Sequence, residues 1–157
     1  MSLLAAIDPG KNHTALALFD RDTREYYRGW LIPTGTYPDG LKHLAGEVEI
    51  VVMELPQVYP GARSNDPNDL ISIAYAGGVV SGYFGPYVTR ETLSPNAWKG
   101  QVPKGVTEKR VLGSMEQFEL DRLSRDLVLI PESLRHNLFD AIGLGLVACG
   151  RVSRGGR

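Results

Sequence analysis

The stretch Leu3-Leu4-Ala5-Ala6-Ile7-Asp8-Pro9-Gly10 decides the fold. Its five apolar residues end at a Pro-Gly pair, a pattern that predicts a buried strand followed by a tight turn. Residues 14–19 are again largely apolar and predict a second strand, so the two form a hairpin with Asp8 at its turn. A carboxylate at the end of a buried strand is costly unless a metal ion, a helix N-terminus or a hydrogen-bonded turn compensates its charge.

The composition is that of one globular domain. The chain has 157 residues, of which 43% are apolar and 22% are charged. It lacks an apolar run near the ~20 residues that a membrane span needs, and it lacks the features of a signal peptide. The single cysteine, Cys149, cannot form an internal disulfide and is expected in the core. We therefore expect a cytoplasmic protein with no membrane partner.

Charge is distributed unevenly along the chain, although the net charge is only −1. The first two thirds are acidic, and basic residues prevail afterwards. Lys99, Lys104, Lys109 and Arg110 lie in one short stretch, and the tail 151–157 contains arginines but no acid. Such clusters are either solvated surface or contacts to phosphates.

Further strands predict a mixed sheet. A third strand over 24–31 completes an antiparallel three-stranded meander. Residues 50–53 form a second continuous apolar run, closed by Glu54, which is typical of a strand buried on both faces in a parallel or mixed sheet. If this strand lies parallel to the first, Asp8 and Glu54 end at the same edge, where open α/β sheets bind ligands. Residues 87–89 predict a fifth strand.

Three helices are predicted from their caps and their apolar residues. Asp66 is a helix cap, and the helix that follows is rich in small apolar residues, which suits core packing and a possible dimer contact over 70–83. Thr107 is expected to cap the next helix. The last helix, over 134–149, has almost no polar face and is therefore expected to be buried.

Asp8, Glu54 and Asp140 each lie in or at the end of an apolar element. Brought together without cations, three carboxylates would repel one another and take up protons. Hard divalent cations such as Mg²⁺ solve this problem, and two of them ~3.5–4 Å apart can clamp the reacting oxygens of a phosphodiester. His136 and Asn137 precede Asp140 by four and three residues, so all three side chains lie along one edge of the last helix.

These pieces in this order resemble RuvC-type Holliday junction resolvases of the RNase H-like superfamily, most closely the short phage-encoded members. The resemblance covers about residues 2–150. It implies a five-stranded mixed sheet flanked by helices, a homodimer, and Mg²⁺- or Mn²⁺-dependent paired nicking of four-way DNA, with two ions per site. We accordingly expect one nuclease domain over 1–150 and a basic tail over 151–157.

The resemblance also implies site residues. Asp8, Glu54 and Asp140 match the metal-binding acids of the family. The family has Asp or His three residues before the last acid. Here that position is Asn137, so His136 is our candidate for the fourth ligand and catalytic residue, since its imidazole can bind metal or move a proton.

The resemblance implies DNA contacts as well. Lys99 and Lys109 correspond to the two DNA-contacting lysines of the family, and Lys104 and Arg110 are their basic neighbours. Tyr59, shortly after the second acid, is the candidate for an aromatic side chain that stacks at the centre of the junction.

Other functions remain open at this point. The same fold could cut RNA–DNA hybrids or structured RNA, or the chain could bind junctions without cutting them. A fragment of an ATPase-like fold also opens with an Asp-x-Gly hairpin, but 157 residues leave no room for its second lobe. The predicted setting is the cytoplasm of a bacterial or phage-infected cell.

Overall fold

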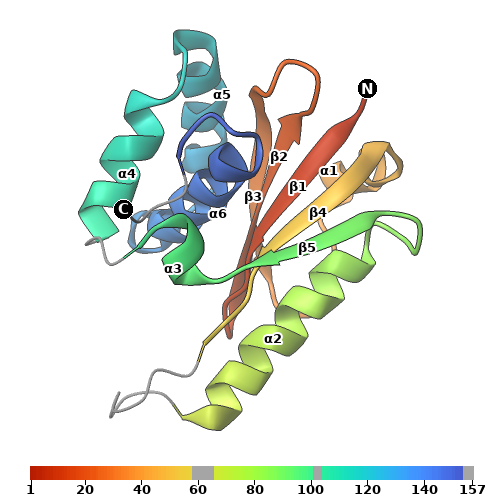
Figure 1. Ribbon diagram of the computed structural model, residues 1–157. Helices are drawn as coiled ribbons and strands as arrows, with labels where there is room; N and C mark the ends of the chain where they lie inside the picture. Colours follow the sequence, from red (N-terminus) through yellow and green to blue (C-terminus); the bar gives the residue numbers. More distant parts are fainter. Residues whose placement is uncertain (58–65, 101–103, 154–157) are drawn as a thin grey trace.

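A five-stranded mixed sheet forms the centre of the protein in a computed structural model (Figure 1). The description leaves out residues 58–65, 101–103 and 154–157 and the side chain of Lys104. The strands are β1 (Leu3–Asp8), β2 (His13–Asp20), β3 (Tyr26–Pro33), β4 (Val48–Glu54) and β5 (Thr89–Leu93), in the spatial order β3-β2-β1-β4-β5. β1, β2 and β3 are antiparallel neighbours, whereas β4 is parallel to both β1 and β5. The predicted meander with added parallel strands is confirmed.

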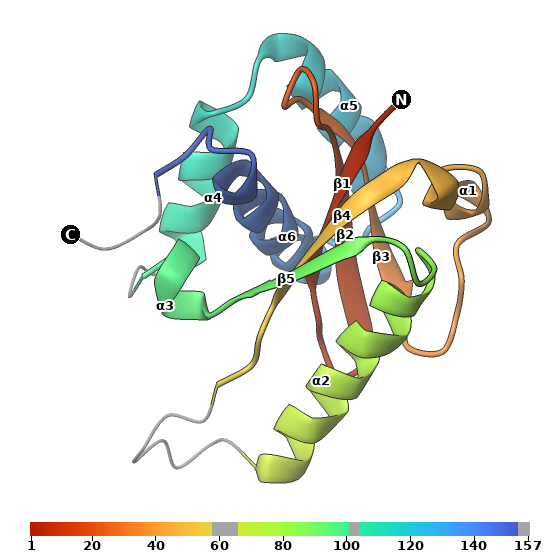
Figure 2. The ribbon, with the colours of Figure 1, turned by 45° about the vertical axis from the view of Figure 1, so that its right-hand side comes forward.

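Helices cover both faces of the sheet (Figure 2). They are α1 (Asp39–Lys42), α2 (Pro67–Gly82), α3 (Pro95–Trp98), α4 (Lys104–Gly113), α5 (Gln117–Val128) and α6 (Arg135–Ala148), with 3-10 turns η1 (Ala45–Glu47) and η2 (Glu132–Leu134). α1 and α2 lie on one face, and α4, α5 and α6 lie on the other. Within the described residues, every helix is too short or too polar to cross a lipid bilayer.

β1 is buried from both sides, and this explains its uninterrupted apolar sequence. Side chains alternate between the faces of a strand. Leu4 and Ala6 accordingly face the core beneath α4, α5 and α6, whereas Leu3, Ala5 and Ile7 face the core on the α2 side. A strand with two buried faces has no polar face to show, so its sequence carries no alternation.

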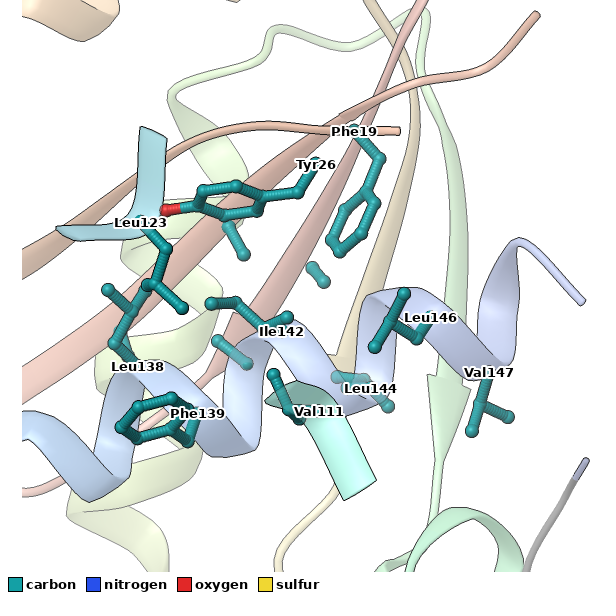
Figure 3. Close-up of a cluster of buried hydrophobic side chains, with 14 of the residues drawn as sticks. Phe19, Tyr26, Val111, Leu123, Leu138, Phe139, Ile142, Leu144, Leu146 and Val147 are labelled. Atoms are coloured by element: carbon teal, nitrogen blue, oxygen red, sulfur yellow. The ribbon is translucent and has the colours of Figure 1, made fainter. Parts of the chain in front are cut away.

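α6 fills the larger of these two cores, as its apolar sequence predicts. Side chains from β2, β3, α4 and α5 surround it (Figure 3). The approach to β2 is so close that a Cβ atom on Gly145 would come within 2.1 Å of the Phe19 ring. Only glycine permits this approach, which brings α6 down onto the sheet.

Two predicted boundaries were wrong. The last strand is Thr89–Leu93, not 87–89, and Tyr87 is fully exposed. It is an edge strand with mostly exposed side chains and therefore has few apolar residues. The more apolar residues just before it consequently resemble a strand more closely. Thr107 does not cap a helix, because α4 already includes Lys104, and Thr107 is buried within it. The cap at Asp66 is confirmed by its bond from the Asn68 amide.

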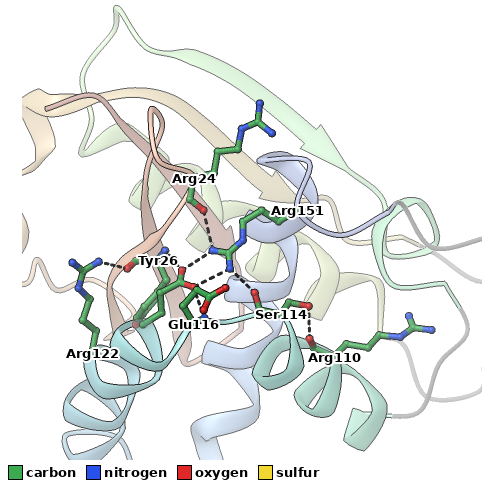
Figure 4. A network of polar contacts seen from close by, with 8 residues as sticks. Arg24, Tyr26, Arg110, Ser114, Glu116, Arg122 and Arg151 are labelled. Atoms are coloured by element: carbon green, nitrogen blue, oxygen red, sulfur yellow. Dashed lines mark hydrogen bonds and ion pairs between the residues drawn. The ribbon is translucent and has the colours of Figure 1, made fainter.

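Arg151 is bound to the domain rather than exposed in a basic tail. Its guanidinium donates to both carboxylate oxygens of Glu119, at 2.6 and 2.8 Å, and to the carbonyls of Arg24 and Ser114 (Figure 4). Glu119 also accepts from the Tyr26 amide at 2.6 Å. The idea that the tail's arginines are free for phosphates therefore does not apply to Arg151, which joins the C-terminal end of the described chain to α5 and β3.

The ion pair predicts an acid-sensitive contribution to stability. Burial alone would raise the pKa of Glu119, but the hydrogen bonds from Arg151 and two backbone amides outweigh it and lower that pKa. A lowered carboxyl pKa stabilises the fold above the ordinary value of 4.5, and this stabilisation is lost as pH falls through the lowered pKa.

We expect Arg151→Met to lower the free energy of unfolding at pH 7 by about 3 kcal/mol, because it leaves the Glu119 carboxylate buried without its cation. The difference from wild type should shrink as the pH falls, because the carboxyl of Glu119 becomes protonated in the variant and no longer buries an unpaired charge. Urea titrations at several pH values measure both effects. Arg21→Met is the control, since its partially exposed pair with Glu49 should contribute less than about 1 kcal/mol. Equal losses in the two variants would contradict the assigned role of Arg151.

Candidate active site

Asp8 and Glu54 end two neighbouring parallel strands. Ile7 of β1 pairs with Met53 of β4, so the two acids follow side by side. Each lies two residues after a side chain that faces the larger core, Ala6 and Val52 respectively. Because side chains alternate along a strand, both acids point to the face that α6 covers.

Asp140 joins them from α6 through a shared cation. The ammonium of Lys99 lies 3.2 Å from Oε2 of Glu54 and 3.4 Å from Oδ2 of Asp140. The side chains of Glu54 and Asp140 are each only 15% exposed, and that of Lys99 is 24% exposed. The structure thus brings together two predicted acids from distant parts of the sequence and places a lysine between them.

Asp8, the third acid, also acts on the charge of Lys99. Burial alone would lower the pKa of its ammonium, but attraction by Glu54, Asp140 and Asp8 outweighs burial, and the net pKa is raised. Three negative charges therefore act on one positive charge. The remaining negative charge suits a further cation.

Trp98 is the site residue that sequence analysis missed. Its indole N–H donates to Oε2 of Glu54 at 2.6 Å. It ends α3, which Ser94 caps by accepting from the Ala97 amide and which Pro95 opens. A Ser-Pro pair is a helix-start signal that could have revealed α3, although not the contact of Trp98 with Glu54.

The residues fit a hard divalent cation by their chemistry. The donors would be the carboxylate oxygens of Asp8, Glu54 and Asp140, the ligand type that Mg²⁺ and Mn²⁺ prefer. In the described part of the chain, however, no three Asp, Glu, His or Cys side chains stand ready in a metal-coordinating arrangement. The Lys99 ammonium instead lies between two of the proposed ligands.

The other predicted site residues lie outside this cluster of acids or outside the described residues. His136 and Asn137 lie in the first turn of α6, both half-buried, and the side chain of neither has a hydrogen bond or ion pair within the described residues. Lys109 and Arg110 are exposed on α4, and Arg110 lines a small hollow together with Lys99. Tyr59 and the side chain of Lys104 fall outside the described residues, so their roles stay predictions.

Solved structures of a bacterial RuvC and of a viral Holliday junction resolvase share this architecture. Thermus thermophilus RuvC matches with a TM-score of 0.52 and 17% identity over 98% of this chain and 99% of that one. The same protein in complex with a Holliday junction substrate matches with a TM-score of 0.59 and 19% identity over 96% and 94%. The fowlpox virus Holliday junction resolvase matches with a TM-score of 0.55 and 12% identity over 94% and 97%.

Comparison by sequence alone gives no match. No family model matches this chain, and neither does any curated protein. The likeness to the solved structures therefore rests on the arrangement of the elements. The chain shares its five-stranded, helix-flanked fold with these resolvase structures.

The position of Lys99 makes metal-free stability sensitive to this residue. We expect Lys99→Met to lower the melting temperature without metal, because two mostly buried carboxylates lose their ammonium. A loss of about 1–2 kcal/mol corresponds to a shift of about 2–8 °C. Saturating Mg²⁺ should raise the melting temperature of the variant more than that of wild type, since the ion no longer competes with an ammonium. Lys109→Met, on exposed α4, is the control. An equal gain from Mg²⁺ in all three proteins would contradict this account.

Proposed function

We propose that this protein is a divalent-metal-dependent endodeoxyribonuclease that resolves four-way or branched DNA by paired nicks, in the cytoplasm. The observation that carries the proposal is the convergence of three acids around Lys99 at the carboxyl edge of the sheet. The likeness in fold to a RuvC bound to a Holliday junction supports DNA junctions as the substrate.

Each acid has a distinct task in this proposal. Asp8 and Glu54 would hold one metal ion, and Asp8 and Asp140 would hold a second. When bound, a pair of Mg²⁺ or Mn²⁺ ions supplies Lewis acidity to the attacking water and to the leaving oxygen of the phosphodiester. His136, one helical turn before Asp140, would bind metal or accept a proton from the water. The limited exposure of Glu54 and Asp140 keeps bulk water from screening their charge.

DNA would be bound by the basic residues beside this site. Lys109 and Arg110 present exposed cations on α4, and Lys104 begins the same helix. Lys99 could turn from the acids to a phosphate once a metal ion has replaced it there. Phosphate contacts fix the position of DNA without reading its sequence. Tyr59 remains our candidate for stacking at the junction centre.

A homodimer would supply the two cuts. The outer face of α2 carries an exposed row of apolar and small residues, Ile71, Tyr75, Gly78 and Gly82, at spacings of four, three and four. Ile71 is 67% exposed and Tyr75 is 70% exposed. Large apolar side chains flanked by glycines permit two copies of a helix to approach closely, and a two-fold axis there would relate two active sites.

The central test uses a synthetic four-way junction. We expect wild type to cut it in Mg²⁺ and not in EDTA, and Asp8→Asn to bind it but lose cleavage by at least about a thousandfold, because both metal positions lose a shared ligand. Single-turnover cleavage assays and gel-shift binding measure the two properties. RNA–DNA hybrids and duplex DNA are the substrate controls.

Mixing the two proteins tests the dimer in the same assay. Mixed dimers of wild type and Asp8→Asn should yield junctions nicked in one strand, whereas a monomer would give only a lower rate of full resolution. Cleavage by Asp8→Asn at the wild-type rate would overturn the acid site, and faster cutting of RNA–DNA hybrids would overturn the substrate.

The identity of the fourth site residue can be tested with a pair of substitutions on α6. We expect His136→Ala to slow cleavage by about 10- to 100-fold, the range typical of lost metal-site support, and Asn137→Ala to slow it much less. Single-turnover rates at saturating Mg²⁺ measure the difference. The opposite ranking would assign the role to Asn137.

A further inference from the structure

We propose that Trp98 is a positioning residue that fixes the carboxylate of Glu54 for metal binding and sets its distance from Asp140. The inference rests on the proposed function, because it assigns Trp98 to the same metal site. It concerns a residue that contacts a ligand of the metal rather than the metal or the DNA.

The hydrogen bond to Glu54 is short and involves a charged acceptor. Indole Nε1–H can only donate, and its distance of 2.6 Å from Oε2 is shorter than is usual for an N–H···O⁻ bond. Lys99 also approaches Oε2. Both contacts are made to Oε2, and we assign the other carboxylate oxygen, Oε1, to the metal ion.

The indole ring is itself held in place. Trp98 is buried, and its Cζ3 atom would be 2.8 Å from a Cβ atom on Gly143, so the absence of a side chain at Gly143 makes room for the ring. Thr107 and Val111 of α4 line the same hollow. A donor fixed by α3, α4 and α6 loses little entropy when it orients a carboxylate.

The same contact couples two acids. Gly143 lies three residues after Asp140 on α6, so the turn of helix that Trp98 packs against is the turn that follows the acid. Trp98 therefore touches β4 through Glu54 and α6 through Gly143. The spacing between Glu54 and Asp140 then depends on the ring that separates their elements.

Trp98 differs from its neighbour Lys99 in one decisive respect. The ammonium competes with a metal ion for the same carboxylates, so the two cations exclude each other. The indole N–H is neutral, and a metal ion on Oε1 does not displace it from Oε2. Partners of this kind orient metal ligands in many sites, and their loss typically lowers metal affinity 10- to 100-fold.

The test compares the two tryptophans of the chain. Trp98→Phe keeps an aromatic ring but removes the N–H donor, and Trp30→Phe is the matched control on β3, where the ring lies beside Arg28. We expect Trp98→Phe to weaken Mn²⁺ binding 10- to 100-fold, measured by the electron paramagnetic resonance of free Mn²⁺, and Trp30→Phe to leave it within twofold of wild type. The Mg²⁺ concentration for half-maximal cleavage should rise by the same factor in Trp98→Phe, with the rate largely recovered at saturation.

A second measurement avoids altering Trp98. In Trp30→Phe, the only remaining tryptophan is Trp98, and its fluorescence should be quenched saturably by Mn²⁺ and unaffected by Mn²⁺ once Asp8→Asn is added. Wild-type Mn²⁺ affinity in folded Trp98→Phe, or no quenching of Trp98 at saturating Mn²⁺, would overturn the inference while leaving the nuclease intact. Absence of Mn²⁺ binding and junction cleavage in wild type would instead refute the proposed function.

Discussion

The repulsion among three carboxylates at one edge of the sheet is the constraint on which the site depends. Asp8, Glu54 and Asp140 come from three elements, and the sheet and α6 hold them close enough to act on one lysine. Carboxylates so placed need positive charge, and Lys99 supplies part of it in the protein alone. The four-residue helix α3 is consequently as important to the site as the strands, because its last residue carries the indole that contacts Glu54 and its C-cap residue, Lys99, carries the ammonium.

A second charged arrangement holds the opposite part of the domain together. Arg151 follows α6 and binds Glu119 of α5, which also accepts a hydrogen bond from the first residue of β3. This pair fixes the helices that cover α6 against the edge of the meander. The positions of Asp140 and Trp98 thus depend on packing that extends along α6 to its C-terminal end.

The fold was predictable wherever residues are buried on both sides. Continuous apolar runs ending in Asp8 and Glu54 predicted two central strands and the edge where they meet, and the apolar α6 predicted its own burial. β5 was misplaced because an edge strand has few apolar residues. Trp98 and the partner of Arg151 could not be found from sequence, since a side chain's type does not reveal which distant group it contacts. The charge pattern of residues 151–157 left solvated surface and phosphate contacts open, whereas in the structure Arg151 binds Glu119.

The burial of α6 between β2 and the outer helices has a consequence for how the chain acquires its structure. The meander that α6 covers precedes β4, β5 and the other helices in the chain, and α6 is synthesised only after them. Until it arrives, one apolar face of the sheet lacks its cover, and partially folded chains with such surfaces tend to aggregate. Contacts between segments so far apart also slow folding, because long loops must close first. The nascent protein would therefore benefit from a chaperone that shields this face.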